Sequence, residues 1–139
     1  MTMTVKAAWT GGIRYLHTSG AGHALVTDGP EPNGGDTAPT PMELVLHGLA
    51  GCTGVDLSLM LAKMRQRVTA LEITVDADRA DEHPRVYTAI RMHIRVSGEV
   101  DQRKFERALE LSHGTYCSVS AMLASTAAIS TTWEIVPEA

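Results

Sequence analysis

Alternating apolar and polar residues in the first quarter of the chain predict a three-stranded meander. The alternation runs over residues 5–10 and again over residues 13–18, and a shorter apolar run occupies residues 23–28. Alternation is the period of a half-buried β-strand, and the short glycine-containing segments between the runs are typical of turns. Residues 28–41 then hold four prolines and three glycines, which predicts a long loop without regular secondary structure.

From about residue 41 to residue 67 the sequence predicts one long helix that is apolar around its whole circumference. Such a helix spans roughly 40 Å, whereas a domain of this length has a radius of gyration of only about 14 Å. A helix without a polar face has to be buried, and one short chain does not supply enough cover for both of its sides. We therefore expect a second copy of the chain to complete the cover, in an intertwined homodimer. The apolar positions are Val45, Leu49, Cys52, Val55 and Leu59 on one face, and Leu46, Ala50, Leu57 and Leu61 on the opposite face.

The same segment is long enough to cross a membrane, but its polar residues argue against a membrane span. Glu43, His47, Asp56 and several glycines interrupt the apolar run. Charges near the middle of a span are costly. The sequence therefore favours a buried core helix, and we expect no membrane partner.

The second half of the chain predicts a long hairpin, two helices and a final strand. Alternation over residues 71–77 and 87–96 indicates two strands whose outer faces are acidic and basic, so that they pair well across a hairpin. Asp101 is placed to cap a helix that stops at Gly114, and a shorter helix is expected over residues 118–125. A last strand follows around residues 129–135. The order β-β-β-α-β-β-α-α-β predicts an α+β fold, with a mainly antiparallel sheet packed on a long buried central helix.

Length and charge narrow the class of protein. The 139 residues suit a single domain over residues 1–139. The net charge is −4 and no basic block is present, so nucleic acid is not an expected partner. The N-terminus has no apolar core of a signal peptide, which predicts a cytoplasmic location. In a reducing compartment the two cysteines are not expected to form a permanent disulfide.

The two cysteines have different predicted surroundings. Cys117 falls at the start of the predicted short helix, where the helix dipole favours a thiolate, whereas Cys52 lies within the long helix, where apolar burial raises the pKa of a thiol. The residues alone thus predict Cys117 as the more reactive thiol, with an inert core role open for each cysteine taken singly. If the two meet in space, they fit a peroxide-reducing cycle through a sulfenic acid and a disulfide.

A metal site built from Cys52, Cys117, His47 and His113 is the competing arrangement. His47 and Cys52 are five residues apart, about 140° around a helix, so they face different ways. The sequence also contains no C-x-x-C, no H-x-x-x-H, no G-x-S-x-G and no phosphate-binding glycine loop. We therefore expect no metal and no cofactor.

Four short motifs resemble the OsmC/Ohr family: PMEL at 41–44, AGC at 50–52, HPRVYT at 83–88 and YCSV at 116–119. The resemblance covers nearly the whole chain. It implies an intertwined α+β homodimer that reduces organic hydroperoxides in oxidative stress defence, with an external dithiol as reductant. It also implies that Cys52 attacks the peroxide and that Cys117 resolves the sulfenic acid as a Cys52–Cys117 disulfide.

The family's peroxidases complete the site with an Arg that pairs with the thiolate and a Glu that orients the Arg. Arg14 and Glu43 are the matching candidates. The peroxidases place the Glu ten residues before the cysteine, whereas Glu43 is nine residues before Cys52. On a regular helix, two side chains ten residues apart are separated by about 80° around the axis, and two side chains nine residues apart by about 180°. Glu43 also fits a carboxylate stabilised by a helix N-terminus, and Arg14 an exposed strand residue. A non-catalytic small-molecule binder or redox sensor with the same fold is therefore the alternative function.

Overall fold

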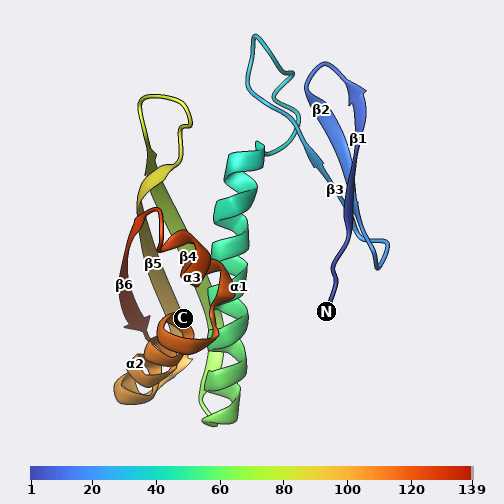
Figure 1. The fold of residues 1–139 in the computed structure, drawn as a ribbon. Coiled ribbons are helices and arrows are strands. Elements are labelled where there is room, and N and C mark those ends of the chain that lie inside the picture. Colours follow the sequence, from blue (N-terminus) through green and yellow to red (C-terminus); the bar gives the residue numbers. More distant parts are fainter. Residues whose placement is uncertain (139) are drawn as a thin grey trace. The chain divides into compact units, whose positions relative to one another are not determined.

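The computed structural model describes residues 1–138 and contains two three-stranded sheets and three α-helices (Figure 1). Two compact units are formed, Met1–Leu46 and His47–Ala139. This content confirms the predicted α+β class, and the assignment of the chain to one domain stays a prediction. The elements are β1 (Val5–Gly11), β2 (Arg14–Ser19), β3 (Ala24–Thr27), α1 (Pro41–Lys63), β4 (Arg67–Arg79), β5 (Tyr87–Glu99), α2 (Gln102–Leu111), the π-helical turn η1 (Ser112–Tyr116), α3 (Ser118–Leu123) and β6 (Ala128–Val136).

The first unit contains the predicted meander, with β1, β2 and β3 paired antiparallel in that order. Gly11 and Gly12 have φ angles of 116° and 58°, so the tight turn between β1 and β2 uses backbone conformations that glycine adopts at little cost. The apolar side chains of this sheet are exposed within one chain, and Trp9 retains 67% of its surface. The alternation therefore predicted the strands correctly, but the first unit by itself does not bury their apolar side chains.

Asp28 holds the proline-rich loop of residues 28–40 at its base. Its buried carboxylate accepts hydrogen bonds from the backbone N–H of Gly29 at 2.8 Å and from the hydroxyl and backbone N–H of Thr37 at 2.6 and 3.1 Å. The Thr37 hydroxyl and these backbone donors stabilise the ionised form and lower the pKa of Asp28 from 3.8 to about 2. The loop is thus fastened by a carboxylate that has to stay charged.

We expect the contribution of Asp28 to stability to disappear in acid. Its pKa is depressed in the folded chain, so the contribution is full above about pH 4 and is lost as the pH falls from about 4 towards about 2. Asp28→Asn should lower the unfolding temperature at pH 7, and its difference from the parent should shrink between pH 4.5 and 2.5. Thermal unfolding followed by circular dichroism measures this, with Asp81→Asn in the exposed hairpin loop as control. A difference that stays constant over this pH range would contradict the assignment.

Helix α1 begins at Pro41 with a reciprocal capping interaction between Thr40 and Glu43. The Thr40 hydroxyl oxygen accepts from the backbone N–H of Glu43 at 3.1 Å, and Glu43 Oε1 accepts from the hydroxyl and backbone N–H of Thr40 at 3.1 and 3.4 Å. This is the capping box, which satisfies backbone donors that the first turn of a helix leaves free. Glu43 therefore stabilises the start of α1.

Helix α1 ends at Lys63, four residues earlier than predicted. Arg65 has a left-handed φ of 60°, its N–H donates to the carbonyl of Ala62, and the N–H of Gln66 donates to the carbonyl of Leu61. These two bonds form the Schellman motif that closes a helix C-terminus. The predicted end at residue 67 is wrong, because Arg67 already belongs to β4.

Only one stripe of α1 is buried within the chain. It contains a residue from every fourth position: Leu49, Thr53, Leu57 and Leu61. Val45, Val55 and Leu59 are exposed, and Leu59 retains 67% of its surface. The expectation that one chain leaves part of this helix uncovered is confirmed.

The second unit is built on the sheet β4–β5–β6, in which β4 and β5 are antiparallel and β5 and β6 are parallel. Three of the four strand pairings in the described chain are antiparallel, as predicted. The acidic and basic outer faces of the hairpin do meet: Arg91 donates to both carboxylate oxygens of Asp78, at 2.9 and 3.1 Å. Because this pair is exposed, it defines register more than it adds stability.

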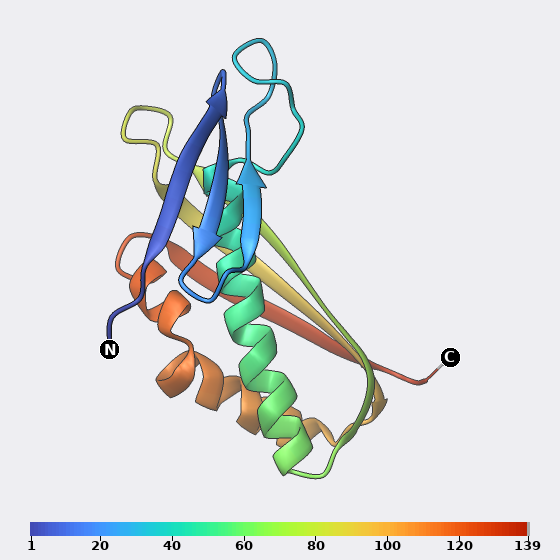
Figure 2. The ribbon, with the colours of Figure 1, turned by 90° about the vertical axis from the view of Figure 1, so that its right-hand side faces the viewer.

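The core of this unit lies where the C-terminal part of α1 and helix α2 cover one face of the sheet (Figure 2). Phe105 of α2 is fully buried, and its ring centroid lies 4.9 Å from that of Trp133 in β6. The buried cluster consists of Leu57, Leu61, Ile94, Val96, Phe105 and Ala108.

Helix α2 does not stop at Gly114. Asp101 caps it as predicted, accepting from the N–H of Lys104 at 3.0 Å, and α2 then passes directly into the π-helical turn η1. Gly114 lies inside that turn, so the predicted stop is wrong. The turn closes when the N–H of Cys117 donates to the carbonyl of Ser112 at 2.8 Å. Single π-turns often occur at functional sites, and this one leads into Cys117.

Candidate redox site

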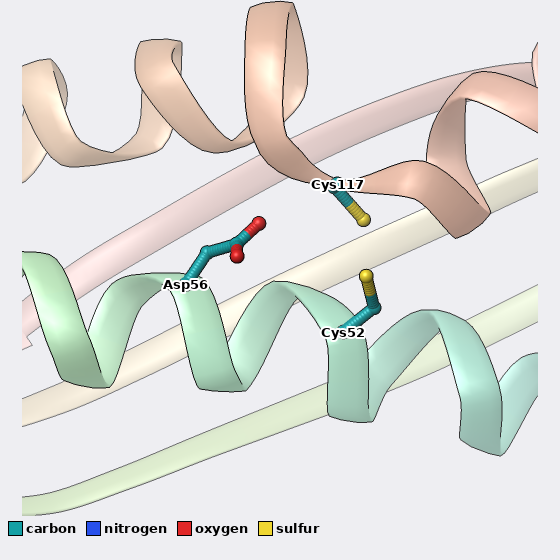
Figure 3. A group of neighbouring side chains, drawn as sticks. All are labelled: Cys52, Asp56 and Cys117. Atoms are coloured by element: carbon teal, nitrogen blue, oxygen red, sulfur yellow. The ribbon is translucent and has the colours of Figure 1, made fainter. Parts of the chain in front are cut away.

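The two cysteines meet in the second unit. Cys52 comes from α1 and Cys117 from the residue between η1 and α3, and their sulfur atoms point towards each other (Figure 3). Both are free thiols. Their Sγ atoms and a carboxylate oxygen of Asp56 all lie within 4.8 Å of one another. A disulfide needs sulfurs about 2 Å apart, so only a short approach separates this pair from a bond.

Cys117 is the more acidic of the two thiols. It is 3% exposed and caps α3, with Sγ accepting from the backbone N–H of Ser120 at 3.4 Å and lying 3.6 Å from Thr53 Oγ1. Burial acts to raise the pKa of Cys117, but hydrogen bonds from Ser120, Thr53 and Cys52 outweigh it and lower the pKa. This agrees with the expectation for a thiol at a helix start.

For Cys52, the effects that raise the thiol pKa outweigh those that lower it. Cys52 is half-buried, and loss of solvation is the main reason that its pKa lies above the ordinary value of 9.0. Its role as hydrogen-bond donor to Cys117, and the negative charges of Cys117 and Asp56, raise the pKa further, against a backbone hydrogen bond at Val119 that lowers it. Cys52 is therefore held as a protonated thiol that lies closer to solvent than Cys117.

Asp56 is the site residue that the sequence analysis did not single out. Its Oδ2 accepts a hydrogen bond from the hydroxyl of Ser112 at 2.9 Å, and Ser112 is fully buried in η1. Asp56 follows Cys52 by four residues, and positions four apart share one face of a helix. That spacing was the available signal, but the residue had been considered only as a charge that argues against a membrane span.

A cavity of about 360 Å³ opens beside Asp56. Its walls are mainly apolar, and its volume lies within the range of small-molecule sites. Asp56 thus belongs both to the thiol cluster and to the cavity wall. The lining residues are Asp56, Leu59, Met60, Lys63, Met64, Leu111 and Tyr116.

Glu43 and Arg14 belong to the first unit, and the two cysteines belong to the second unit. Glu43 is exposed, and its carboxylate is used by Thr40 in the capping box. Arg14 is an exposed residue at the start of β2, paired in register with Gly11. The roles of Arg14 and Glu43 at Cys52 stay predictions.

The alternative metal set is not assembled as the sequence suggested. Among the residues that the structure describes, the two cysteines are grouped with Asp56 and not with His47 or His113. His113 Nε2 lies 3.2 Å from Thr131 Oγ1, and burial lowers the pKa of this histidine.

The α+β fold and the facing thiols define a two-cysteine protein with a redox-capable site. The sequence model of the family described as "OsmC-like protein" matches residues 34–132, and the chain therefore belongs to the OsmC-like protein family. This confirms the family resemblance. Family membership and the paired cysteines support a role in redox chemistry or stress response.

Relatives of known sequence and structure cover almost the whole chain. Protein YhfA of Escherichia coli (strain K12) is 37% identical over 135 residues, which are 96% of this chain and 98% of YhfA. A hypothetical protein from Aquifex aeolicus VF5 is 28% identical with a TM-score of 0.89, covering 100% of this chain and 99% of that one. The organic hydroperoxide resistance protein OsmC of Legionella pneumophila shares the fold at 18% identity, with a TM-score of 0.73 and coverage of 96% and 97%.

Helix α1 is long and apolar enough to cross a membrane by length and composition. The core helix of a soluble protein passes the same test, and one such helix is weak evidence for a span.

Proposed function

We propose that this protein is a thiol-dependent peroxidase that reduces organic hydroperoxides in the cytoplasm. The observation that carries the proposal is the approach of Cys52 Sγ and Cys117 Sγ to within 4.8 Å. Two thiols at this separation pass into a disulfide with little movement, which is what a two-cysteine catalytic cycle requires. The mainly apolar cavity beside Asp56 suits an organic group in preference to hydrogen peroxide.

The cycle has three balanced steps. Cys52 Sγ attacks the terminal oxygen of ROOH, the S–O bond forms as the O–O bond breaks, and Cys52 sulfenic acid and ROH result. Cys117 Sγ then attacks the sulfenic sulfur, and the thiol proton leaves with the hydroxyl group as water while the Cys52–Cys117 disulfide forms. An external dithiol reduces this disulfide by exchange and is itself oxidised.

We assign the first attack to Cys52 because it is the thiol that a hydroperoxide can reach. Cys52 is half-buried, whereas Cys117 is 3% exposed. The lower pKa of Cys117 suits the second step, since a thiolate is the better nucleophile towards the sulfenic sulfur. The lower pKa of Cys117 thus favours its attack on the sulfenic acid of Cys52.

A binding or redox-sensing role with the same fold is the second candidate. It is favoured by the raised pKa of Cys52, due mainly to burial, and by the hydrogen bonds that Glu43 makes to Thr40 in the capping box. A sensor forms the same disulfide but turns over slowly. The steady-state rate with excess organic hydroperoxide and dithiol separates the two roles.

The proposed activity is tested by titrating the reduced protein with cumene hydroperoxide. One equivalent should convert the protein to a form two mass units lighter, with peptide mapping that links Cys52 to Cys117. With dithiothreitol present, peroxide consumption should continue beyond one equivalent. Failure to form the disulfide would refute the peroxidase, whereas a disulfide without turnover would favour the sensor.

We also propose that the working form is a homodimer. Family members are commonly homodimers, and one chain leaves apolar side chains uncovered on α1 and on the first sheet. Light scattering at micromolar concentration should give twice the chain mass of 14.9 kDa. Changing exposed Leu59 to Glu should shift the mass towards the monomer, whereas Glu72→Gln on the polar face of β4 should not. A monomeric parent would contradict the proposal.

A further inference from the structure

The carboxylate of Asp56 faces both thiols of the pair (Figure 3). One of its oxygens lies within 4.8 Å of both sulfur atoms, and the same residue lines the adjoining cavity. Its place on α1, one turn after Cys52, makes this proximity a property of the helix itself. Asp56 is therefore the described carboxylate that lies close both to Cys52 and to the cavity.

We propose that Asp56 is the proton carrier of the oxidation step, taking the proton of Cys52 Sγ and delivering it to the oxygen that leaves when the peroxide bond breaks. This inference rests on the peroxidase function proposed above.

A buried hydroxyl holds the carboxylate of Asp56 in position. The hydroxyl of fully buried Ser112 donates to Asp56 Oδ2 at 2.9 Å, which orients the carboxylate. A carboxylate has about four acceptor positions, so this bond leaves capacity for the Cys52 proton. The π-helical turn η1 that contains Ser112 also leads into Cys117. This one turn therefore positions both Ser112, which binds Asp56, and Cys117.

The need for a carrier follows from the state of Cys52. The thiol is kept protonated, so it has to lose its proton as it attacks, while the departing alkoxide is strongly basic and has to gain one. A carboxylate beside the sulfur and in the cavity wall serves both ends of the transfer. The proton leaves Cys52 Sγ, passes through Asp56 and ends on ROH, while sulfur is oxidised by two electrons and the peroxide oxygens are reduced by two. Asp56 finishes the step in the protonation state in which it began.

A purely electrostatic role for Asp56 predicts the opposite effect. A negative charge beside Cys52 disfavours its thiolate, so removing that charge would make the thiol more acidic and faster towards every electrophile. His113 feels the charge of Asp56, and Lys63 lines the same cavity, but neither is in the group formed by the sulfurs and the carboxylate. The proton-carrier role and the electrostatic role are thus distinguished by whether removal of the Asp56 charge slows or speeds the oxidation of Cys52.

The test compares oxidation with alkylation in a Cys117→Ser background, where Cys52 is the only thiol. Cumene hydroperoxide requires a proton for its leaving oxygen, whereas iodoacetamide releases iodide, which requires none. We expect Asp56→Asn to slow oxidation at pH 7 by about 100-fold and to leave alkylation equal or faster. Asp81→Asn makes the same chemical change in the exposed hairpin loop and should leave both rates within about twofold.

Equal rates of oxidation for Asp56→Asn and its parent, or a parallel rise in oxidation and alkylation, would overturn the proton-carrier role. No oxidation of Cys52 in the Asp56-containing parent would instead refute the peroxidase itself. A circular dichroism spectrum of Asp56→Asn that matches the parent reports that the variant is folded. If this variant does not fold, Ser112→Ala, which releases the carboxylate from its hydrogen bond, should slow oxidation without slowing alkylation, and equal rates would contradict the inference.

Discussion

Replacing Cys52 by serine should abolish hydroperoxide reduction, with a loss of roughly a thousandfold or more in kcat/KM. A serine hydroxyl is not ionised near neutral pH and is a poor nucleophile towards a peroxide oxygen, so no other group replaces the sulfur. The measurement is peroxide consumption with dithiothreitol as reductant. Cys117→Ser is the matched control, because it makes the same atom change 65 residues along the chain.

The two serine variants should fail at different steps. Cys117→Ser should be oxidised once at a rate close to the parent, and its sulfenic acid should then persist and be trapped by dimedone. Cys52→Ser should give neither sulfenic acid nor consumption. The reverse pattern, with sulfenic acid found only in Cys52→Ser, would assign the first attack to the more acidic Cys117. Consumption by Cys52→Ser at the parental rate would remove the peroxidase proposal.

Replacing Phe105 by alanine should have the largest effect on stability, about 3–5 kcal/mol of unfolding free energy. The ring is fully buried between α1, α2 and the sheet and lies 4.9 Å from Trp133, so its removal leaves a cavity at the centre of the second unit. Since domains of this size are stable by about 5–15 kcal/mol, such a loss is a large part of the total.

Urea unfolding followed by circular dichroism measures this loss, at one protein concentration for all variants because a dimer's stability depends on concentration. Tyr116→Ala is the control, since this aromatic residue is exposed and its truncation should cost less than about 1 kcal/mol. A cost for Phe105→Ala no larger than that for Tyr116→Ala would show that the ring does not support the core.

The strands were predictable because their signal is local. Alternation with a period of two places side chains on alternate faces, so it identified the meander, the long hairpin and the last strand. The cap at Asp101 and the pairing of acidic with basic residues across the hairpin were predictable for the same reason, since both depend on neighbours in the helix or hairpin.

The ends of the helices were not predictable from the same signals. Arg65 adopts φ of 60°, a conformation for which the sequence offered no glycine or asparagine as a marker, and so α1 was extended to residue 67. Gly114 looked like a helix stop, but the chain passes through it in a π-helical turn. Both misses arise from backbone conformations that packing and hydrogen bonds select over local propensity.

For the site, the sequence by itself determined the two cysteines, the helix that carries one of them and the helix start that makes the other more acidic. It also determined that a chain with so apolar a helix needs more cover than it provides. Only the tertiary structure decided that the two sulfurs meet, because 65 residues separate them and no local rule sets that distance. It also decided that Asp56 faces them, because the π-turn that brings Ser112 to this carboxylate depends on α2, η1 and α1 packing together.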